Sequence, residues 1–306
     1  MSDQPPPAPA RQGGLSLCMP VYNKARLLPR TLASIQRQNI PDLEIVAVDN
    51  GSKDDSRQVL ESWRDRLDVK IYSLPKTISL YDNWLLALSL GTREFLKLQL
   101  ADDVIPDGAI NTLLQHLRAH EELGFVFGNT WPMAENGDLI ESGDTHAYWS
   151  EVNGIRAQAG RARTLREKAG CLARMRIGWS LFGDANATIF RAQLLAHLRR
   201  GIHHQSAAFE TWPEYEINLR LLAAAQGGHL DIAGSYFSYD LDGHLARVES
   251  PGMRRRLIDM PAASLFFLLM LDPDLRPLVH EAGLRYQLKL VCWFVAKHTL
   301  IHLGKR

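Results

Sequence analysis

The sequence predicts an α/β fold whose central sheet is mostly parallel and flanked by helices. Short apolar stretches alternate with segments of helical spacing, and polar turn residues follow the apolar stretches. A strand, a helix and another strand in succession are typical of parallel sheets with right-handed crossovers. The 306 residues are enough to bury such a core.

Four strands, each followed by a helix, are predicted in the first part of the chain. The strands are rich in Val, Ile and Leu, and the helices repeat apolar residues every three or four positions. The strands are expected within residues 15–23, 43–56, 69–74 and 93–100, and the helices within 24–38, 56–67, 79–91 and 107–120.

The second half alternates less regularly. Its elements are expected to be a strand at 124–133, a basic helix at 161–176, a loop, strand and helix at 178–195, a helix at 212–228, a strand within 229–244 and helices after 246. The pair Gly227-Gly228 is expected to end the helix that precedes it, because glycine commonly stops a helix.

Composition excludes several classes of protein. Apolar residues make up 46% and charged residues 23%, as in soluble globular proteins, and a net charge of +1 gives no reason to expect a nucleic-acid partner. The three cysteines are far apart and odd in number, which favours a reducing compartment and therefore the cytoplasm. Residues 1–14 lack the apolar region of a secretion signal and are predicted to be a disordered leader.

Polar clusters follow three of the predicted strands. They are Val21-Tyr22-Asn23, Asp49-Asn50-Gly51-Ser52 and Asp102-Asp103. Each cluster alone would also suit a turn. Because ligands of parallel sheets bind beyond the carboxyl ends of the strands, the three together predict one binding site.

Asp102 and Asp103 supply two adjacent carboxylates at a strand end, where their mutual repulsion calls for a positive partner. Carboxylate oxygens are good ligands for Mg²⁺ or Mn²⁺, and such an ion can bridge to diphosphate. The sequence contains neither a Gly-x-x-x-x-Gly-Lys loop nor a G-x-G-x-x-G motif. The chain is therefore predicted to use a nucleoside-diphosphate donor held by metal, and not to be a kinase, a GTPase or a dinucleotide enzyme.

Three segments together resemble the family 2 glycosyltransferases of GT-A fold. They are LSLCMPVYNKARLLPRTLASIQRQ, LEIVAVDNGSKDDS and REFLKLQLADDVIPDGAI. The resemblance extends over residues 15–245, which implies a nucleotide-binding half (15–130), an acceptor half (131–245) and a helical C-terminal region (246–306). It also implies inverting, metal-dependent transfer from a nucleotide-diphosphate sugar to a glycan or lipid-linked hydroxyl, in cell-surface polysaccharide biosynthesis, with Mn²⁺ or Mg²⁺ as cofactor.

The resemblance implies roles for the first two polar clusters. Pro20, Val21 and Tyr22 would line the pocket for the nucleobase and ribose. Asp49 would hydrogen-bond the base, with Asn50 beside it, where many family members have a second aspartate.

The resemblance also implies a metal site. Asp103 would be the metal ligand, and Asp102 would contact ribose or a metal-bound water. Leu100 replaces the first aspartate of the longer family motif, so a single carboxylate would do most of the binding. His244 lies near the position of a further metal ligand.

On the acceptor side, the resemblance implies a general base in the segment PEYEINLRLL. Counting six positions back from Arg220 gives Glu214, where many relatives have aspartate, and Glu216 is the alternative. Such a base takes the proton of the acceptor hydroxyl as it attacks the sugar. The loop expected near the transferred sugar contains Gly183, Asp184 and Ala185.

The last 23 residues, from Leu284, combine apolar and basic side chains. Such a helix can lie on an anionic membrane surface, here the cytoplasmic face, which would suit a lipid-linked acceptor. Packing on the enzyme body or on the second subunit of a homodimer would explain the same pattern.

Two other functions remain open from the sequence. One is a nucleotidyltransferase on a related fold, although its usual glycine-rich first loop is missing from LCMPVYNKAR. The other is a non-catalytic protein that binds sugar nucleotides, which Leu100 and Glu214 leave open because both depart from the family pattern.

Overall fold

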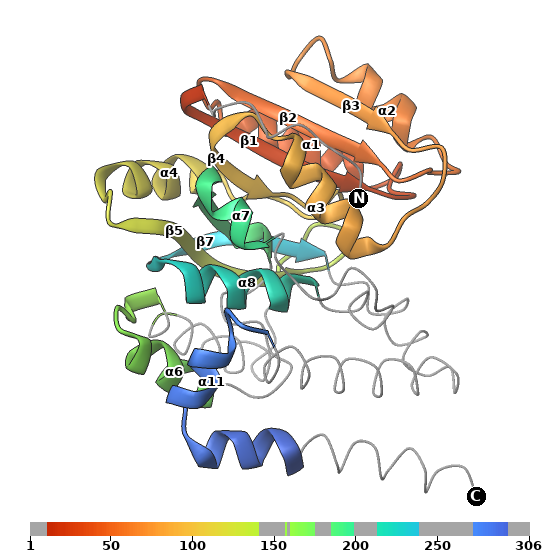
Figure 1. Cartoon of the computed structure of the whole chain (residues 1–306). Helices are drawn as coiled ribbons and strands as arrows, with labels where there is room; N and C mark the ends of the chain where they lie inside the picture. Colours follow the sequence, from red (N-terminus) through yellow and green to blue (C-terminus); the bar gives the residue numbers. More distant parts are fainter. Residues whose placement is uncertain are drawn as a thin grey trace, which may run out of the picture.

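The computed structural model describes residues 11–140, 157, 160–174, 185–198, 213–238 and 272–292. Within these residues a seven-stranded sheet has the order β3-β2-β1-β4-β6-β5-β7 (Figure 1). β1 pairs in parallel with β2 and β4, β2 with β3, and β5 with β7, whereas β6 runs antiparallel to β4 and β5. The sheet is mostly parallel, so the predicted fold class is confirmed.

The strands and helices follow the predicted alternation. The strands are β1 (Arg11–Val21), β2 (Leu43–Asp49), β3 (Val69–Ser73), β4 (Arg93–Leu98), β5 (Leu123–Met133), β6 (Thr188–Arg191) and β7 (Gln226–Ser238). The helices are α1 (Leu28–Arg37), α2 (Ser56–Ser62), α3 (Leu80–Leu90), α4 (Ala109–Ala119), α6 (Leu165–Arg174), α7 (Leu195–Leu198), α8 (Pro213–Ala224) and α11 (Arg276–Glu281), with short 3₁₀ helices η1 (Ala185–Ala187) and η2 (Ala192–Leu194).

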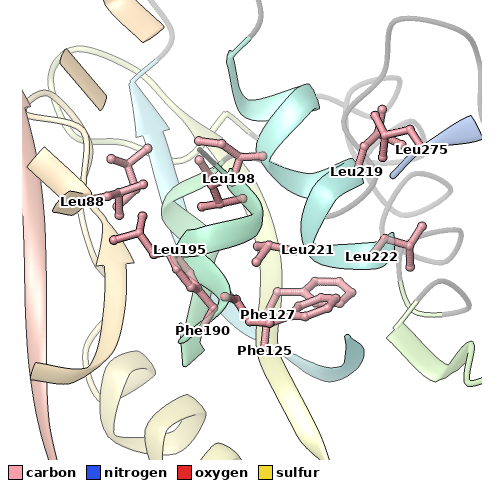
Figure 2. Close-up of a cluster of buried hydrophobic side chains, with 14 of the residues drawn as sticks. Leu88, Phe125, Phe127, Phe190, Leu195, Leu198, Leu219, Leu221, Leu222 and Leu275 are labelled. Carbon is pink, nitrogen blue, oxygen red and sulfur yellow. The ribbon is translucent and has the colours of Figure 1, made fainter. Parts of the chain in front are cut away.

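Two apolar cores lie on the two faces of the sheet. On one face, Leu17 and Met19 of β1 pack with Leu32 of α1 and with residues of α2 and α4. On the other face, Cys18 and Leu96 belong to a cluster that includes side chains of α3, α6, α7, α8 and α11. Figure 2 shows part of this second cluster around α7 and α8. The period of two along the strands thus separates the two helical layers.

Two predicted boundaries are wrong. β1 begins at Arg11, so residues 11–14 belong to the sheet and not to the leader. Gly227 and Gly228 do not end α8, which stops at Ala224, but lie inside β7. A Cβ on Gly227 would come within 2.4 Å of the ring of Phe125, so close packing of β7 on β5 explains the glycine there.

The parallel pairing brings the polar clusters to one edge. Val21 is opposite Asp49 in the β1–β2 register, and Cys18 is opposite Leu98 in the β1–β4 register. The carboxyl ends of β1, β2 and β4 are therefore neighbours, and the loops that follow them meet at the same rim of the sheet.

Candidate donor site

A cavity of about 650 Å³ lies at this rim. Its walls come from the loop after β1, from Asn50 after β2, from residues 77–84 at the start of α3 and from residues 100–102 after β4. The predicted meeting of the three polar clusters is thus present in the structure. The volume is within the usual range for small-molecule sites, roughly 300–1,000 Å³.

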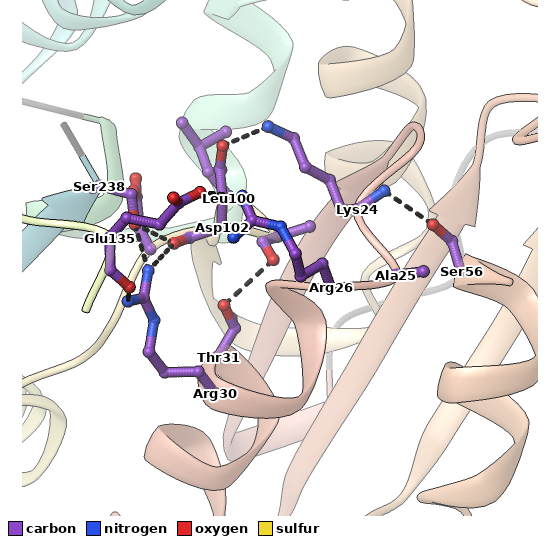
Figure 3. Close-up of polar contacts among 12 residues, drawn as sticks. Lys24, Ala25, Arg26, Arg30, Thr31, Ser56, Leu100, Asp102, Glu135 and Ser238 are labelled. Atoms are coloured by element: carbon purple, nitrogen blue, oxygen red, sulfur yellow. Dashed lines mark hydrogen bonds and ion pairs between the residues drawn. The ribbon is translucent and has the colours of Figure 1, made fainter. Parts of the chain in front are cut away.

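Hydrogen bonds fix the loop after β1 against the loop after β2. The backbone N–H of Asn23 donates to Ser52 Oγ (3.0 Å). The Asn23 Oδ1 accepts from the backbone N–H of Lys53 (2.8 Å). The backbone N–H of Lys24 donates to Ser56 Oγ at 2.8 Å (Figure 3). The short polar side chains of both clusters therefore form the rim itself.

Of the residues predicted to contact the nucleobase, some line the cavity and others are buried behind it. Pro20, Tyr22 and Asn50 line the cavity, and the Tyr22 side chain is exposed. Val21 and Asp49 are buried and do not line it. The Asp49 carboxylate accepts a hydrogen bond from the backbone of the turn that follows it, at 3.0 Å.

Asn50 shapes the cavity by holding residues 77 and 78. Its Nδ2 donates to the Ile78 carbonyl (3.0 Å), and its Oδ1 accepts from the Ile78 backbone N–H (2.8 Å). The neighbouring Gly51 has φ +70°, and a Cβ there would lie 3.3 Å from Thr77 Oγ1. This close approach explains the glycine.

One wall of the cavity was not predicted from the sequence. Ile78, Leu80, Asn83 and Trp84 line it from the start of α3. Asn83 is 2% exposed, and its Oδ1 has no hydrogen-bond partner among the residues that the structure describes. A buried acceptor without a partner is costly, so a ligand that donates a hydrogen bond to it would be favoured. The signal in the sequence is an amide on an otherwise apolar helical face.

Asp102 and Asp103 have different surroundings. The Asp102 side chain is 24% exposed, lines the cavity and forms an ion pair with the Lys24 ammonium (Figure 3). Asp103 is 4% exposed and does not line the cavity. Its Oδ1 accepts from the Ser238 backbone N–H at 2.7 Å, and its Oδ2 accepts from Asn186 Nδ2. The geometry therefore favours Asp102, rather than Asp103, as the carboxylate available to a ligand.

A buried polar network supports the end of β4 from behind. The Lys97 ammonium is fully buried and donates to Gln99 Oε1 (2.9 Å) and to the carbonyl of Asn186. Asn186 Oδ1 accepts from the Leu100 backbone N–H at 2.7 Å. This network attaches the strand end to η1, which begins with the predicted acceptor-side residue Ala185.

Arg30 holds the Asp102 peptide from the other side. Its Nη2 donates to Ser238 Oγ (2.7 Å) and to the Asp102 carbonyl (3.3 Å), and its Nη1 donates to the Glu135 carbonyl (2.8 Å). Figure 3 shows these contacts converging beside Asp102. Helix α1, the end of β7 and the segment after β5 are thus joined at the predicted metal position.

The acceptor-side predictions are only partly covered. Ala185 is buried in η1, whereas Gly183, Asp184 and the predicted metal ligand His244 lie outside the described residues. Among the residues that the structure describes, no three His, Cys, Asp or Glu side chains are grouped closely enough to hold a metal ion.

The two base candidates on α8 differ in accessibility. Glu214 lies in the first turn of α8 and is half-buried, outside the cavity lining. Glu216 is fully buried, and its Oε1 accepts a hydrogen bond from Arg220 Nε at 2.8 Å. This ion pair leaves Glu216 without access to an acceptor, so Glu214 is the better-placed candidate.

Comparison with known proteins assigns the chain to a family. The sequence profile described as glycosyl transferase family 2 matches residues 16–179, which is more than half of the chain. The chain belongs to glycosyl transferase family 2.

Two curated relatives are named as glycosyltransferases. The GalNAc(5)-diNAcBac-PP-undecaprenol beta-1,3-glucosyltransferase of Campylobacter jejuni is 33% identical over 117 residues, 38% of this chain and 37% of that protein. The abequosyltransferase RfbV of Salmonella typhimurium is 26% identical over 141 residues, 44% of this chain and 40% of that protein. The matches thus span less than half the length of these relatives.

Two solved structures share the fold. S. aureus TarS 1–349 in complex with UDP-GlcNAc has a TM-score of 0.56 and 18% identity, over 94% of this chain and 72% of that one. The mannosyltransferase PcManGT of Pyrobaculum calidifontis, in complex with GDP-Man and Mn²⁺, has a TM-score of 0.58 and 16% identity, over 99% and 83%. At these identities the likeness establishes the GT-A fold alone.

Proposed function

We propose that the protein is an inverting, metal-dependent glycosyltransferase. It transfers a sugar from a nucleotide-diphosphate donor to a hydroxyl of a lipid-linked or polysaccharide acceptor. The observation that carries this proposal is the rim cavity, which combines the Tyr22 ring, the Asn83 amide and the Asp102 carboxylate in one space. The name of the C. jejuni relative, which includes PP-undecaprenol, supports a lipid-linked acceptor.

The nucleoside of the donor would occupy the part of the cavity lined by Pro20, Tyr22 and Trp84. Aromatic rings offer a flat apolar surface on which a base can stack, worth about 1–3 kcal/mol per base. Asn83 Oδ1 would accept a hydrogen bond from the donor. Asp49, buried outside the cavity lining, would support the base indirectly by holding the turn after β2 through the Ser52 backbone N–H.

The residues present fit a divalent ion at Asp102. Mg²⁺ is commonly held by one or two carboxylates plus substrate phosphates, so a single accessible carboxylate is sufficient. Mg²⁺ or Mn²⁺ bound there would supply positive charge to the departing diphosphate. Lys24, which pairs with Asp102 in this structure, would have to turn from the carboxylate toward the diphosphate when the ion binds. His244 remains a proposed ligand that the described residues do not include.

Glu214 is the proposed general base. The first turn of a helix favours a carboxylate in its ionised form, because the positive end of the helix dipole lies there. An ionised Glu214 can accept the proton of the acceptor hydroxyl while its oxygen attacks the anomeric carbon and the diphosphate leaves from the opposite face.

A turnover assay with purified protein and Mn²⁺ tests the proposal. A nucleotide sugar that is turned over with release of nucleoside diphosphate supports the transferase. Binding without turnover would instead support a sugar-nucleotide-binding protein. Release of pyrophosphate from a nucleoside triphosphate would support a nucleotidyltransferase, which family membership already disfavours.

We also propose that the C-terminal helical segment contacts an anionic membrane at its cytoplasmic face. In the helical turns 284–292, Leu284 and Leu288 are 69% and 52% exposed, and Val291 is exposed beside them. Arg285 and Lys289 are exposed on the same segment. An apolar stripe with basic neighbours is typical of helices that lie on anionic lipid. Among the described residues, no helix is long and apolar enough to cross a membrane.

A further inference from the structure

Helix α8 carries a buried ionic network that the proposed chemistry does not use. Arg220 is 1% exposed, and its Nε donates to Glu216 Oε1 (2.8 Å). Its Nη2 donates to Asp272 Oδ2 at 2.6 Å. Both carboxylates are buried to the same degree as Arg220. Burying three charges is expensive and is weak evidence for stability, so another advantage of the network has to be sought.

The Asp272 carboxylate is also held by the backbone of the C-terminal segment. Its Oδ1 accepts from the backbone N–H groups of Asp274 (2.9 Å) and Leu275 (3.3 Å), in the turn that leads into α11. One carboxylate oxygen is thus fixed to the C-terminal segment and the other to α8. Asp272 lies far beyond the stretch 16–179 that matches the family profile, so the family motif does not account for it.

Apolar contacts keep water away from this connection. Leu275, Leu278 and Val279 of the C-terminal segment are buried in the same cluster as Leu219 and Leu222 of α8. Figure 2 shows Leu275 beside Leu219. Because the surroundings are apolar, an uncompensated charge at Arg220 would be strongly unfavourable. The orientation of α8 that satisfies Arg220 is therefore preferred.

The same network adjoins the wall of the donor cavity. Tyr81, on the helix α3 that lines the cavity, is buried in this cluster. Burial and the nearby Glu216 carboxylate raise the pKa of Tyr81, which places this carboxylate close to α3. Glu216 thus connects through Arg220 to Asp272 of the C-terminal segment, and it lies two residues after Glu214.

We propose that Asp272 is a positioning residue for the general base. Through Arg220 and Glu216 it fixes the rotation of α8, and with it the direction of Glu214 toward the acceptor hydroxyl. This inference rests on the proposed role of Glu214. It also gives the C-terminal segment a part in transfer that does not depend on membrane contact.

Asp272→Asn tests the proposal, because asparagine keeps the shape and an oxygen for the turn but removes the charge that Arg220 pairs with. We expect kcat to fall by about 10-fold or more, since a misplacement of about 1 Å can cost ~10²-fold, while donor Kd and KM stay unchanged. Asp272→Glu should recover part of kcat. Glu281→Gln is the matched control, because Glu281 is an exposed carboxylate on α11 of the same C-terminal segment, and it should behave as wild type.

The double variant Glu214→Gln/Asp272→Asn separates positioning from general damage. If Asp272 acts through Glu214, the double variant should be no slower than Glu214→Gln alone. If the fall in kcat of the double variant equals the product of the two single falls, the inference is overturned. An unchanged kcat or a parallel loss of donor affinity in Asp272→Asn would also overturn it. Wild-type turnover by Glu214→Gln would instead overturn the assignment of the base, which distinguishes the two failures.

A second variant covers the case in which Asp272→Asn does not fold at the assay temperature. Glu216→Gln removes the other partner of Arg220 and leaves the Asp272 pair in place. It should show the same fall in kcat at unchanged donor affinity. Wild-type kcat in Glu216→Gln would contradict the proposal.

Discussion

Asp102 and Asp103 are neighbours in the chain, yet their carboxylates lie in opposite environments. Asp102 borders the cavity and pairs with Lys24, whereas Asp103 is buried and accepts hydrogen bonds from Asn186 and from the Ser238 backbone. One carboxylate is therefore available to a ligand, and the other joins the ends of β4 and β7 to η1. The resemblance implied the metal for Asp103 and ribose or a metal-bound water for Asp102, whereas this arrangement exposes Asp102 to the cavity and buries Asp103.

Glu214→Gln should reduce transfer by about 10²-fold or more, the usual scale for a general base, and leave donor affinity unchanged. Steady-state kinetics and calorimetric titration of the donor measure the two effects. Glu281→Gln, at an exposed position of α11, is the matched control and should retain wild-type rates. Equal turnover by Glu214→Gln and wild type would remove Glu214 from the mechanism.

Asn83→Leu should weaken donor binding by roughly 2–10-fold, because it removes a hydrogen-bond acceptor worth about 0.5–1.5 kcal/mol from the cavity wall. Stability should hold or rise, since an unpartnered buried oxygen is lost. Titration of the donor and thermal unfolding check these effects. Asn111→Leu, on α4 away from the cavity, should leave affinity unchanged. A donor that binds Asn83→Leu as tightly as wild type would contradict the contact.

We expect the folded protein to lose stability in acid because folding lowers the pKa of Glu44. Burial alone would raise its pKa, but hydrogen bonds from Lys70, Ser16 and Thr92 lower it to about 2. Because the folded-state pKa lies below the ordinary value of 4.5, the stabilisation is complete above pH 4.5 and is lost as the pH falls toward 2. The loss is on the order of 3 kcal/mol.

Urea unfolding between pH 2 and 7 measures this dependence. Glu44→Gln should be less stable than wild type at pH 7 and should flatten the acid limb of the stability curve. A wild-type curve that stays flat between pH 4.5 and 2 would show that Glu44 gains nothing from its ionised form.

Wild-type protein should sediment with vesicles that contain an anionic lipid and not with neutral vesicles. Leu284→Ser/Leu288→Ser should reduce binding by about 10²-fold or more, since each leucine side chain that is buried in lipid contributes roughly 1.5–3 kcal/mol. Leu139→Ser is the control, because Leu139 is also exposed but is distant in the sequence from the C-terminal helix. If these leucines instead join two copies of the chain, the wild-type protein will not bind the vesicles. It will elute as a dimer in size-exclusion chromatography, and the double variant will elute as a monomer.

The sequence predicted the layers of the fold well because the strands and helices have clear apolar periods, as in β2 and α1. Tertiary packing decided the remainder. Gly227 has the appearance of a helix stop, and only the ring of Phe125 across the sheet reveals its purpose. Similarly, Asn83 lies outside the segments that carry the resemblance, and Lys24 lies inside the first of them without an assigned role. Both enter the site because α3 and the loop after β1 meet at the rim.

The ionic connection between Arg220 and Asp272 could not be predicted for the same reason. Its two residues are 52 positions apart, and no local period links them. The difference between Asp102 and Asp103 depends on where Asn186 and Ser238 arrive, which is again a matter of tertiary structure.

Anomalous scattering from a crystal of the protein with a nucleotide sugar and Mn²⁺ would locate the metal and the donor together. We expect a manganese peak at the Asp102 carboxylate, with the diphosphate beside it and the nucleoside against Tyr22. A peak on Asp103, or a donor bound outside the rim cavity, would contradict this expectation.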